Sequence, residues 1–154
     1  VDPVAAGDRV PGLNQDAVNQ HFAVLRDQVP TFLYTSDADR AKRLALFTLR
    51  HQPSVPFIDN DQFELIGAGP GEIKSRNVGH FAFRYKAVTI SEFVFEGLPL
   101  DAVSGREAET ALGLARVDTK GDINLLAWRS GNFTYILVGR VPLDDLFQMV
   151  GSGI

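Results

Sequence analysis

The sequence predicts an α+β domain, in which an antiparallel sheet of about six strands follows two helices and precedes a short C-terminal helix. Apolar residues recur at helical spacing through the first third of the chain. From residue 63 onward the apolar period changes to two, which is typical of strands. These strands follow one another without intervening helices, so we expect antiparallel pairing and not a doubly wound parallel sheet.

The first helix is expected to begin at Asn14, a residue type that caps helices. Before it, residues 1–13 hold two prolines and no apolar period, which predicts a flexible lead-in. Pro30 is expected to end the helix, and residues 31–34 to form a short connection. The predicted apolar stripe of this helix is Val18, His21, Phe22, Leu25 and Val29.

A second helix is predicted from Asp37 to Arg50, ended by Pro53 and Pro56. Ser36 and Asp39 have the form of a capping box at its start. Its expected apolar stripe is Ala41, Leu44, Ala45 and Leu49, with Phe47 at the margin.

The strands are predicted from alternating side chains, and one face of the sheet is expected to pack under the helices. Phe81, Phe83 and Tyr85 share one face of their strand, and Lys86-Ala87 predicts a tight hairpin to the next. The segment from Gly97 to Thr110 breaks the alternation and is expected to be a mobile loop. The other turns are expected at Pro70-Gly71, at residues 118–122 and at residues 130–132. The six expected strands are Phe63–Gly69, His80–Tyr85, Val88–Val94, Leu112–Val117, Ile123–Trp128 and Phe133–Val138.

Pro142 suits the first turn of the C-terminal helix, and Asp144 and Asp145 complement its positive end. Residues 151–154 are expected to fray, so that one domain spans residues 14–150. The predicted buried stripe of this helix is Leu143, Leu146, Phe147 and Val150.

Composition excludes several function classes. A net charge of −4 argues against a nucleic-acid partner, and the basic cluster Arg40, Lys42, Arg43 and Arg50 is interpreted as a solvated helix face beside Asp37 and Asp39. The absence of cysteine removes disulfides and thiolate chemistry. No apolar run approaches the roughly 20 residues that span a bilayer. Without an initiating methionine or a signal peptide, the chain is expected to begin within a longer gene product.

Two groups of residues resemble ligand sites. Gly67, Gly69 and Gly71 resemble part of a dinucleotide loop, but a strand is expected after them, so they are interpreted as a glycine-rich turn. Asp59, Asp61 and Glu64 lack the central glycine of a calcium loop and are interpreted as a polar turn.

The three histidines, His21, His51 and His80, lie on separate expected elements. Converging, they could bind a metal. The favoured interpretation places His21 and His80 at the edge of the core, and whether the three converge stays open.

No enzymatic constellation is visible. The G-x-S-x-G pattern is missing and Ser104 lies in an expected surface loop. Asp144 and Asp145 point about 100° apart on a helix. Trp128 and Tyr135 could line a ligand groove, but a core pair is favoured. No catalytic, cofactor-binding or metal-binding residue is therefore predicted.

Three segments stand out for their order along the chain: VPFIDNDQFELIGAG, FAFRYKAVTISEFVFE and LLAWRSGNFTYILVGRVPLDDL. Together they resemble the extracytoplasmic domain of bacterial transmembrane anti-sigma factors and related membrane-anchored regulators. The resemblance implies a periplasmic location, an anchor in the inner membrane, and sigma-factor binding only through a cytoplasmic segment that this sequence lacks. It brings no catalytic residues.

The leading hypothesis is a non-catalytic periplasmic sensor or interaction domain, which contacts a protein partner (a periplasmic regulator or a protease) or shields a protease site. A homodimer stays open. The alternative is a soluble periplasmic binding module for a small apolar ligand or a metal. An enzyme of unrecognised type ranks last.

Overall fold

Eight antiparallel strands form one sheet in the computed structural model, which describes residues 10–152. The α+β class and the antiparallel pairing are confirmed, but the prediction of about six strands is wrong. The order across the sheet is β1-β2-β3-β4-β8-β7-β6-β5, so two four-stranded meanders meet where β4 pairs with β8. The strands are β1 (Leu33–Tyr34), β2 (Glu64–Ile73), β3 (Arg76–Tyr85), β4 (Val88–Glu96), β5 (Arg106–Thr110), β6 (Gly113–Lys120), β7 (Ile123–Ser130) and β8 (Phe133–Gly139).

The two additional strands lie at the two edges of the sheet. Strand β1 lies within residues 31–34, which were expected to form a connection. It has two residues, which pair with Gly67 and Ala68. Strand β5 falls within the expected mobile loop Gly97–Thr110, which is not an open loop. This segment also contains the 3-10 helix η2 (Leu100–Ala102) and buries Leu98, Ala102 and Val103 against the sheet.

The hairpin turns differ in part from those expected. Strand β2 continues through Pro70-Gly71, where a turn was predicted, and the chain reverses instead at Lys74 and Ser75, which both have positive φ. The expected loop 118–122 shrinks to a two-residue turn, because β6 extends to Lys120. The tight turn at Lys86-Ala87 is confirmed.

Helix α1 (Leu13–Leu25) begins one residue earlier than expected and ends well before Pro30. Gly12, at φ 76°, precedes it, so Asn14 is not its cap but part of its buried face. The expected flexible lead-in is wrong for its last residues, because the Val10 N–H donates to the Ala102 carbonyl and Leu13 is buried. Its residues 1–9 lie outside the described part of the chain. Leu25 is exposed, since the buried stripe consists of Leu13, Asn14, Ala17, Val18, His21 and Val24.

Helix α2 (Ala38–Leu46) is shorter than the predicted Asp37–Arg50. Its cap is Asp37, whose carboxylate accepts a hydrogen bond of 3.2 Å from the Arg40 N–H, so the predicted capping box of Ser36 and Asp39 is wrong.

Helix α3 (Leu143–Ser152) follows Pro142 as expected and includes Gly151 and Ser152, which were expected to fray. Residues 153–154 lie outside the described part of the chain. No helix among residues 10–152 is long and apolar enough to cross a membrane.

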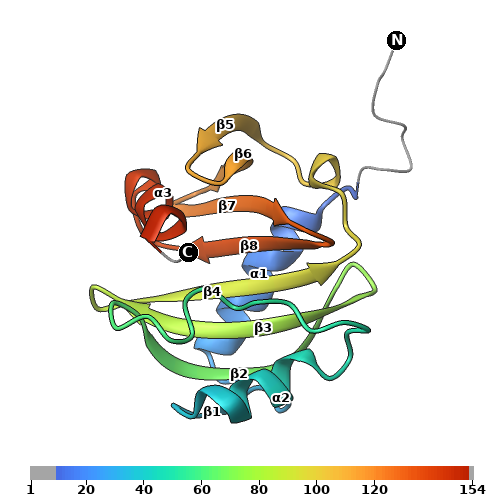
Figure 1. Ribbon diagram of the computed structural model, residues 1–154, viewed down its shortest axis with the longest axis vertical. Helices are drawn as coiled ribbons and strands as arrows, with labels where there is room; N and C mark the ends of the chain where they lie inside the picture. Colours follow the sequence, from blue (N-terminus) through green and yellow to red (C-terminus); the bar gives the residue numbers. More distant parts are fainter. Residues whose placement is uncertain (1–9, 153–154) are drawn as a thin grey trace.

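The helices cover both faces of the sheet, so the expectation that one face packs under all of them is wrong (Figure 1). On one face, here called the α1 face, Leu13, Ala17 and Val18 pack on residues of β4, β7 and β8. The opposite face, the α2/α3 face, packs against α2, α3 and the irregular 47–63 segment, which runs across β3 and β4. As predicted, the side chains of Phe81, Phe83 and Tyr85 share one face of β3, and this is the α2/α3 face.

Candidate functional site

A groove of about 660 Å³ lies between the outer side of α2 and the residues that lead into β1. Positions 40, 43, 44 and 47 recur three or four residues apart, so they form one stripe opposite the buried Ala41 and Ala45. The groove is lined by Pro30, Thr31, Leu33, Arg40, Arg43, Leu44, Phe47 and Pro70.

Exposed apolar side chains distinguish this groove. Phe47 is 68% exposed and Leu33 39%, and Tyr34, next to Leu33 on β1, is 59% exposed. Phe47 was expected at the margin of the buried stripe, but it follows the last residue of α2 and turns outward. Large aromatic side chains are usually buried, so this exposure sets the groove apart.

The cations of the groove have no acidic partners within the described residues. Arg40 and Arg43 form no ion pair there, whereas five other cations do. Those pairs are Arg84–Glu64, Lys86–Asp145, Arg116–Asp101, Lys120–Asp118 and Arg140–Asp122. Two residues of the basic cluster, Arg40 and Arg43, therefore line a groove with exposed apolar side chains, in addition to being exposed to solvent.

A second hollow, of about 390 Å³, is lined mainly by polar residues, of which Thr48 directly follows Phe47 in the chain. His51 lies 2.5 Å from Glu96 through Nδ1 and Oε2, and Glu96 also accepts a hydrogen bond of 2.7 Å from the Arg50 N–H. The hydrogen bond from His51 is the main reason that the pKa of Glu96 is lowered. Arg50 and Arg76, which also line the hollow, have no ion-pair partner among residues 10–152.

A third hollow, of about 730 Å³, lies between the β3–β4 turn and α3. Among the described residues its one cation is Lys86, which lies 3.8 Å from the carboxylate of Asp145 and above the ring of Tyr85. This charge is already paired, so the α2 groove is the better candidate for a charged partner.

Two of the three histidines converge, but the third does not join them. The Ser91 hydroxyl lies 2.6 Å from Nδ1 of His21 and 2.9 Å from Nε2 of His80, while His51 lies apart beside Glu96. No group of three metal-ligating side chains occurs within residues 10–152. A metal centre built from all three histidines is therefore not formed.

Burial keeps the converging histidines neutral. It lowers the pKa of His21 to about 4, with a smaller contribution from the charge of Arg140, and the pKa of His80 to about 3, with a smaller contribution from His21. Ser91 can then donate to one imidazole and accept an N–H from the other. The arrangement connects α1 to β3 and β4. His21 and His80 are 2% and 1% exposed, so both lie inside the core and not at its edge, where they were expected.

A buried acid that sequence reasoning passed over lies on the α2/α3 face. Glu92 is fully buried between Phe81 and Leu137 on the neighbouring strands, and neither carboxylate oxygen has a hydrogen-bond partner. Burial raises its pKa to about 8. The signal in the sequence was its place in the alternation Ile90, Glu92, Val94, which puts it on an apolar face.

The remaining candidates have structural positions. Gly67 and Gly69 lie in β2, where Leu33 and Thr31 approach too closely for a side chain, and Gly71 also belongs to β2 and not to a turn. Trp128 and Tyr135 are cross-strand partners with stacked rings 5.1 Å apart, which confirms the predicted core pair. Asp59, Asp61 and Glu64 are exposed, and Glu64 pairs with Arg84. Ser104 accepts a hydrogen bond from Asn14 through its carbonyl group, and Asp144 and Asp145 lie in the first turn of α3.

Strongly shifted titratable groups and surface hollows therefore occupy different places in this domain. His21, His80 and Glu92 are enclosed in the core, whereas the hollow at α2 presents apolar and cationic side chains to solvent. No family model matches the chain, and neither the curated proteins nor the solved structures contain a match to it.

Proposed function

We propose that this chain is a non-catalytic protein-interaction domain and that its partner docks on the α2 groove. The observation that carries the proposal is the exposed ring of Phe47 beside Arg40 and Arg43, which have no ion-pair partner among residues 10–152. Aromatic residues and arginine are enriched at protein interfaces, and arginine contributes strongly to their hot spots. A groove that combines both offers contact energy without any catalytic group.

The proposed setting is the periplasmic part of a membrane-anchored regulator of the anti-sigma type. The segments that carry the resemblance correspond to the end of the 47–63 segment with β2, to the β3–β4 hairpin, and to the β7–β8 hairpin with α3. In this setting the partner is a periplasmic regulator or a protease, and docking or release on the α2 groove passes on the signal.

Site-specific photo-crosslinking in the native bacterium tests this proposal. A photoreactive phenylalanine at position 47 is expected to form an adduct with one defined protein, identified by mass spectrometry. The same label at Leu114, which is 44% exposed on β6, is the matched control. Equal labelling patterns at positions 47 and 114 would contradict the proposal.

One observation favours a second candidate, a binding module for a small apolar anion. The groove volume of about 660 Å³ falls within the range of small-molecule sites. A medium-chain fatty acid would then raise the melting temperature by mass action, and would do so in the wild-type protein but not in Arg40→Gln/Arg43→Gln. No shift in either protein would rule this candidate out.

A further inference from the structure

We infer that the partner contributes an acidic segment with one apolar anchor, which inserts at Phe47 while its carboxylates meet arginines on both sides. The inference rests on the proposed function, since it identifies the chemistry of the partner at the same groove. Arg40 and Arg43 lie on the groove side of Phe47, and Arg50 and Arg76 on the side of the polar hollow.

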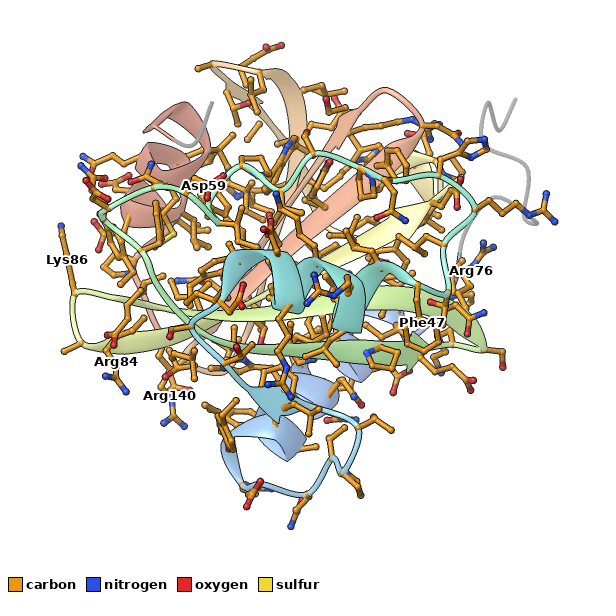
Figure 2. All side chains as sticks on the ribbon, turned by 60° about the horizontal axis from the view of Figure 1, so that its bottom comes forward. Phe47, Asp59, Arg76, Arg84, Lys86 and Arg140 are labelled. Atoms are coloured by element: carbon orange, nitrogen blue, oxygen red, sulfur yellow. The ribbon has the colours of Figure 1, made fainter. Side chains whose placement is uncertain are left out.

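The groove and the polar hollow are lined by consecutive residues of the chain. Phe47 lines the groove, and the next residue, Thr48, lines the polar hollow. Figure 2 shows Phe47 and Arg76 at the same end of the molecule, beyond the C-terminal end of α2. A segment anchored on the ring of Phe47 would therefore reach guanidinium groups in both directions along its length.

Charge complementarity also favours an acidic segment. The whole chain carries a net charge of −4, yet cations without an ion-pair partner in the described part of the chain lie around α2 and the neighbouring end of β3. Two nearby acids are already engaged: Asp37 caps α2, and Glu96 accepts from His51 and from the Arg50 N–H. Asp39, in the first turn of α2, forms no ion pair within the described residues. The guanidinium groups are left to bind carboxylates from outside, often in the bidentate geometry that arginine favours.

The outer edge of β2 disfavours recognition of the partner by strand addition. Pro70 of β2 lines the groove and has no N–H to donate, and β1 already covers Gly67 and Ala68. Addition of a partner strand along this edge would meet a missing donor. Recognition therefore depends on side chains, namely an apolar anchor and flanking carboxylates.

Fluorescence anisotropy with synthetic peptides tests the inference on the full chain. The probe is a labelled peptide of about twelve residues in which one central phenylalanine is flanked by glutamates on both sides. One control peptide carries lysines in place of the glutamates, and a second carries serine in place of the phenylalanine. Only the acidic, anchored peptide is expected to bind. Its affinity is expected to weaken about five-fold between low salt and roughly 0.3 M salt, because salt screens exposed charges.

Variants of the chain locate the binding. Phe47→Ser is expected to lower the affinity for the acidic peptide about ten-fold. Arg40→Gln/Arg43→Gln is expected to lower this affinity by a similar factor. Arg50→Gln/Arg76→Gln tests the side of the polar hollow and is expected to lower the affinity for the acidic peptide about five-fold. Leu114→Ser and Arg106→Gln, which change an exposed apolar residue and an exposed arginine elsewhere, are the matched controls and are expected to bind as the wild type does.

The outcomes separate the two proposals. Binding of the lysine peptide, or equal binding by the Phe47 and Leu114 variants, would overturn the acidic-anchor inference. Co-sedimentation with phosphatidylglycerol vesicles that depends on the same arginines, without peptide binding, would overturn it in favour of a lipid surface. A specific crosslink at position 47 with no acidic-peptide binding would reject the partner chemistry while leaving the interaction function in place. Failure of both experiments would reject both.

Discussion

The hydroxyl group of Tyr135 donates a hydrogen bond of 2.7 Å to the carbonyl oxygen of Ser54, and so ties the 47–63 segment to the centre of the sheet. The ring of Tyr135 stacks on Trp128, which in turn contacts Phe57 of the same segment. The 47–63 segment is therefore held on the α2/α3 face by this hydrogen bond, by the contacts of Arg50 and His51 with Glu96, and by a group of aromatic rings.

Tyr135→Phe removes only the hydrogen bond to the Ser54 carbonyl. We expect a loss of about 1 kcal/mol in the free energy of unfolding, because the ring stack remains and the Ser54 carbonyl can be hydrated. Hydrogen exchange should show faster exchange of amides within residues 50–63 and unchanged protection in β7. Uniform acceleration over the whole sheet would show that the hydrogen bond does not act locally.

Glu92→Gln is expected to reduce the dependence of the free energy of unfolding on pH in the range below about pH 8. The folded protein keeps the Glu92 proton up to about pH 8, whereas the unfolded chain loses it near pH 4.5. Unfolding therefore releases a proton between these values, and stability falls as pH rises, at up to about 1.4 kcal/mol per pH unit. Urea titrations between pH 6.5 and 8 measure the slope. Glu64→Gln, which changes an exposed acid, should keep the wild-type slope, and an equal slope in Glu92→Gln would contradict the assignment.

Ser91→Ala should destabilise the domain by about 1–3 kcal/mol, since it leaves two buried imidazole nitrogens without their shared partner. Because the contact joins α1 to the sheet, the amides of α1 should exchange faster as well. Ser130→Ala, at an exposed position on β7, is the control and should change stability by less than about 0.5 kcal/mol. A loss no larger than that of the control would mean that the hydroxyl does not support α1.

The same two histidines predict a loss of stability in acid. Their pKa values in the folded protein, about 4 for His21 and about 3 for His80, lie below the usual 6.5, so the unfolded chain takes up protons first as pH falls. Full stability is present above pH 6.5, and at pH 5 each histidine costs about 2 kcal/mol. His21→Gln should reduce this dependence in denaturant titrations between pH 6.5 and 5, and an unchanged dependence would contradict the assignment.

Gly69→Ala should destabilise the pairing of β2 with the preceding segment. A Cβ atom at this position would lie 2.5 Å from the carbonyl oxygen of Thr31, so the backbone must shift. We expect a loss of about 2 kcal/mol or more in thermal or urea unfolding. Gly151→Ala in α3, where the nearest atom would be 4.0 Å away, should not destabilise. Similar behaviour of the two variants would contradict the close approach.

Alternating apolar residues were sufficient to predict six of the strands, because packing of each strand on a core leaves a local pattern. Strand β1 consists of two residues, and β5 has the sequence Arg-Glu-Ala-Glu-Thr, so neither shows such a pattern. Both depend on a neighbouring strand to supply the ladder. The position of α1 on the opposite face from α2 is also a non-local property, which the spacing of apolar residues on a helix does not encode.

The candidate site could be predicted less well than the fold. Arg40 and Arg43 were visible as a basic cluster, but the outward turn of Phe47 depends on where α2 ends, and helix ends are poorly defined by apolar spacing. The contact of His21 with Ser91 joins residues 70 positions apart. Only the buried Glu92 had a local signal, since it interrupts an apolar face of its strand.

The pairing of β4 with β8 also bears on synthesis at the ribosome. Strand β4 is complete at Glu96, but its neighbour begins only at Phe133. A nascent chain that has emerged as far as β4 therefore presents an unpaired strand edge flanked by Phe93 and Phe95, which is the kind of surface that chaperones bind. The two meanders can join only after β8 has left the exit tunnel, so closure of the sheet is a late step of folding during synthesis.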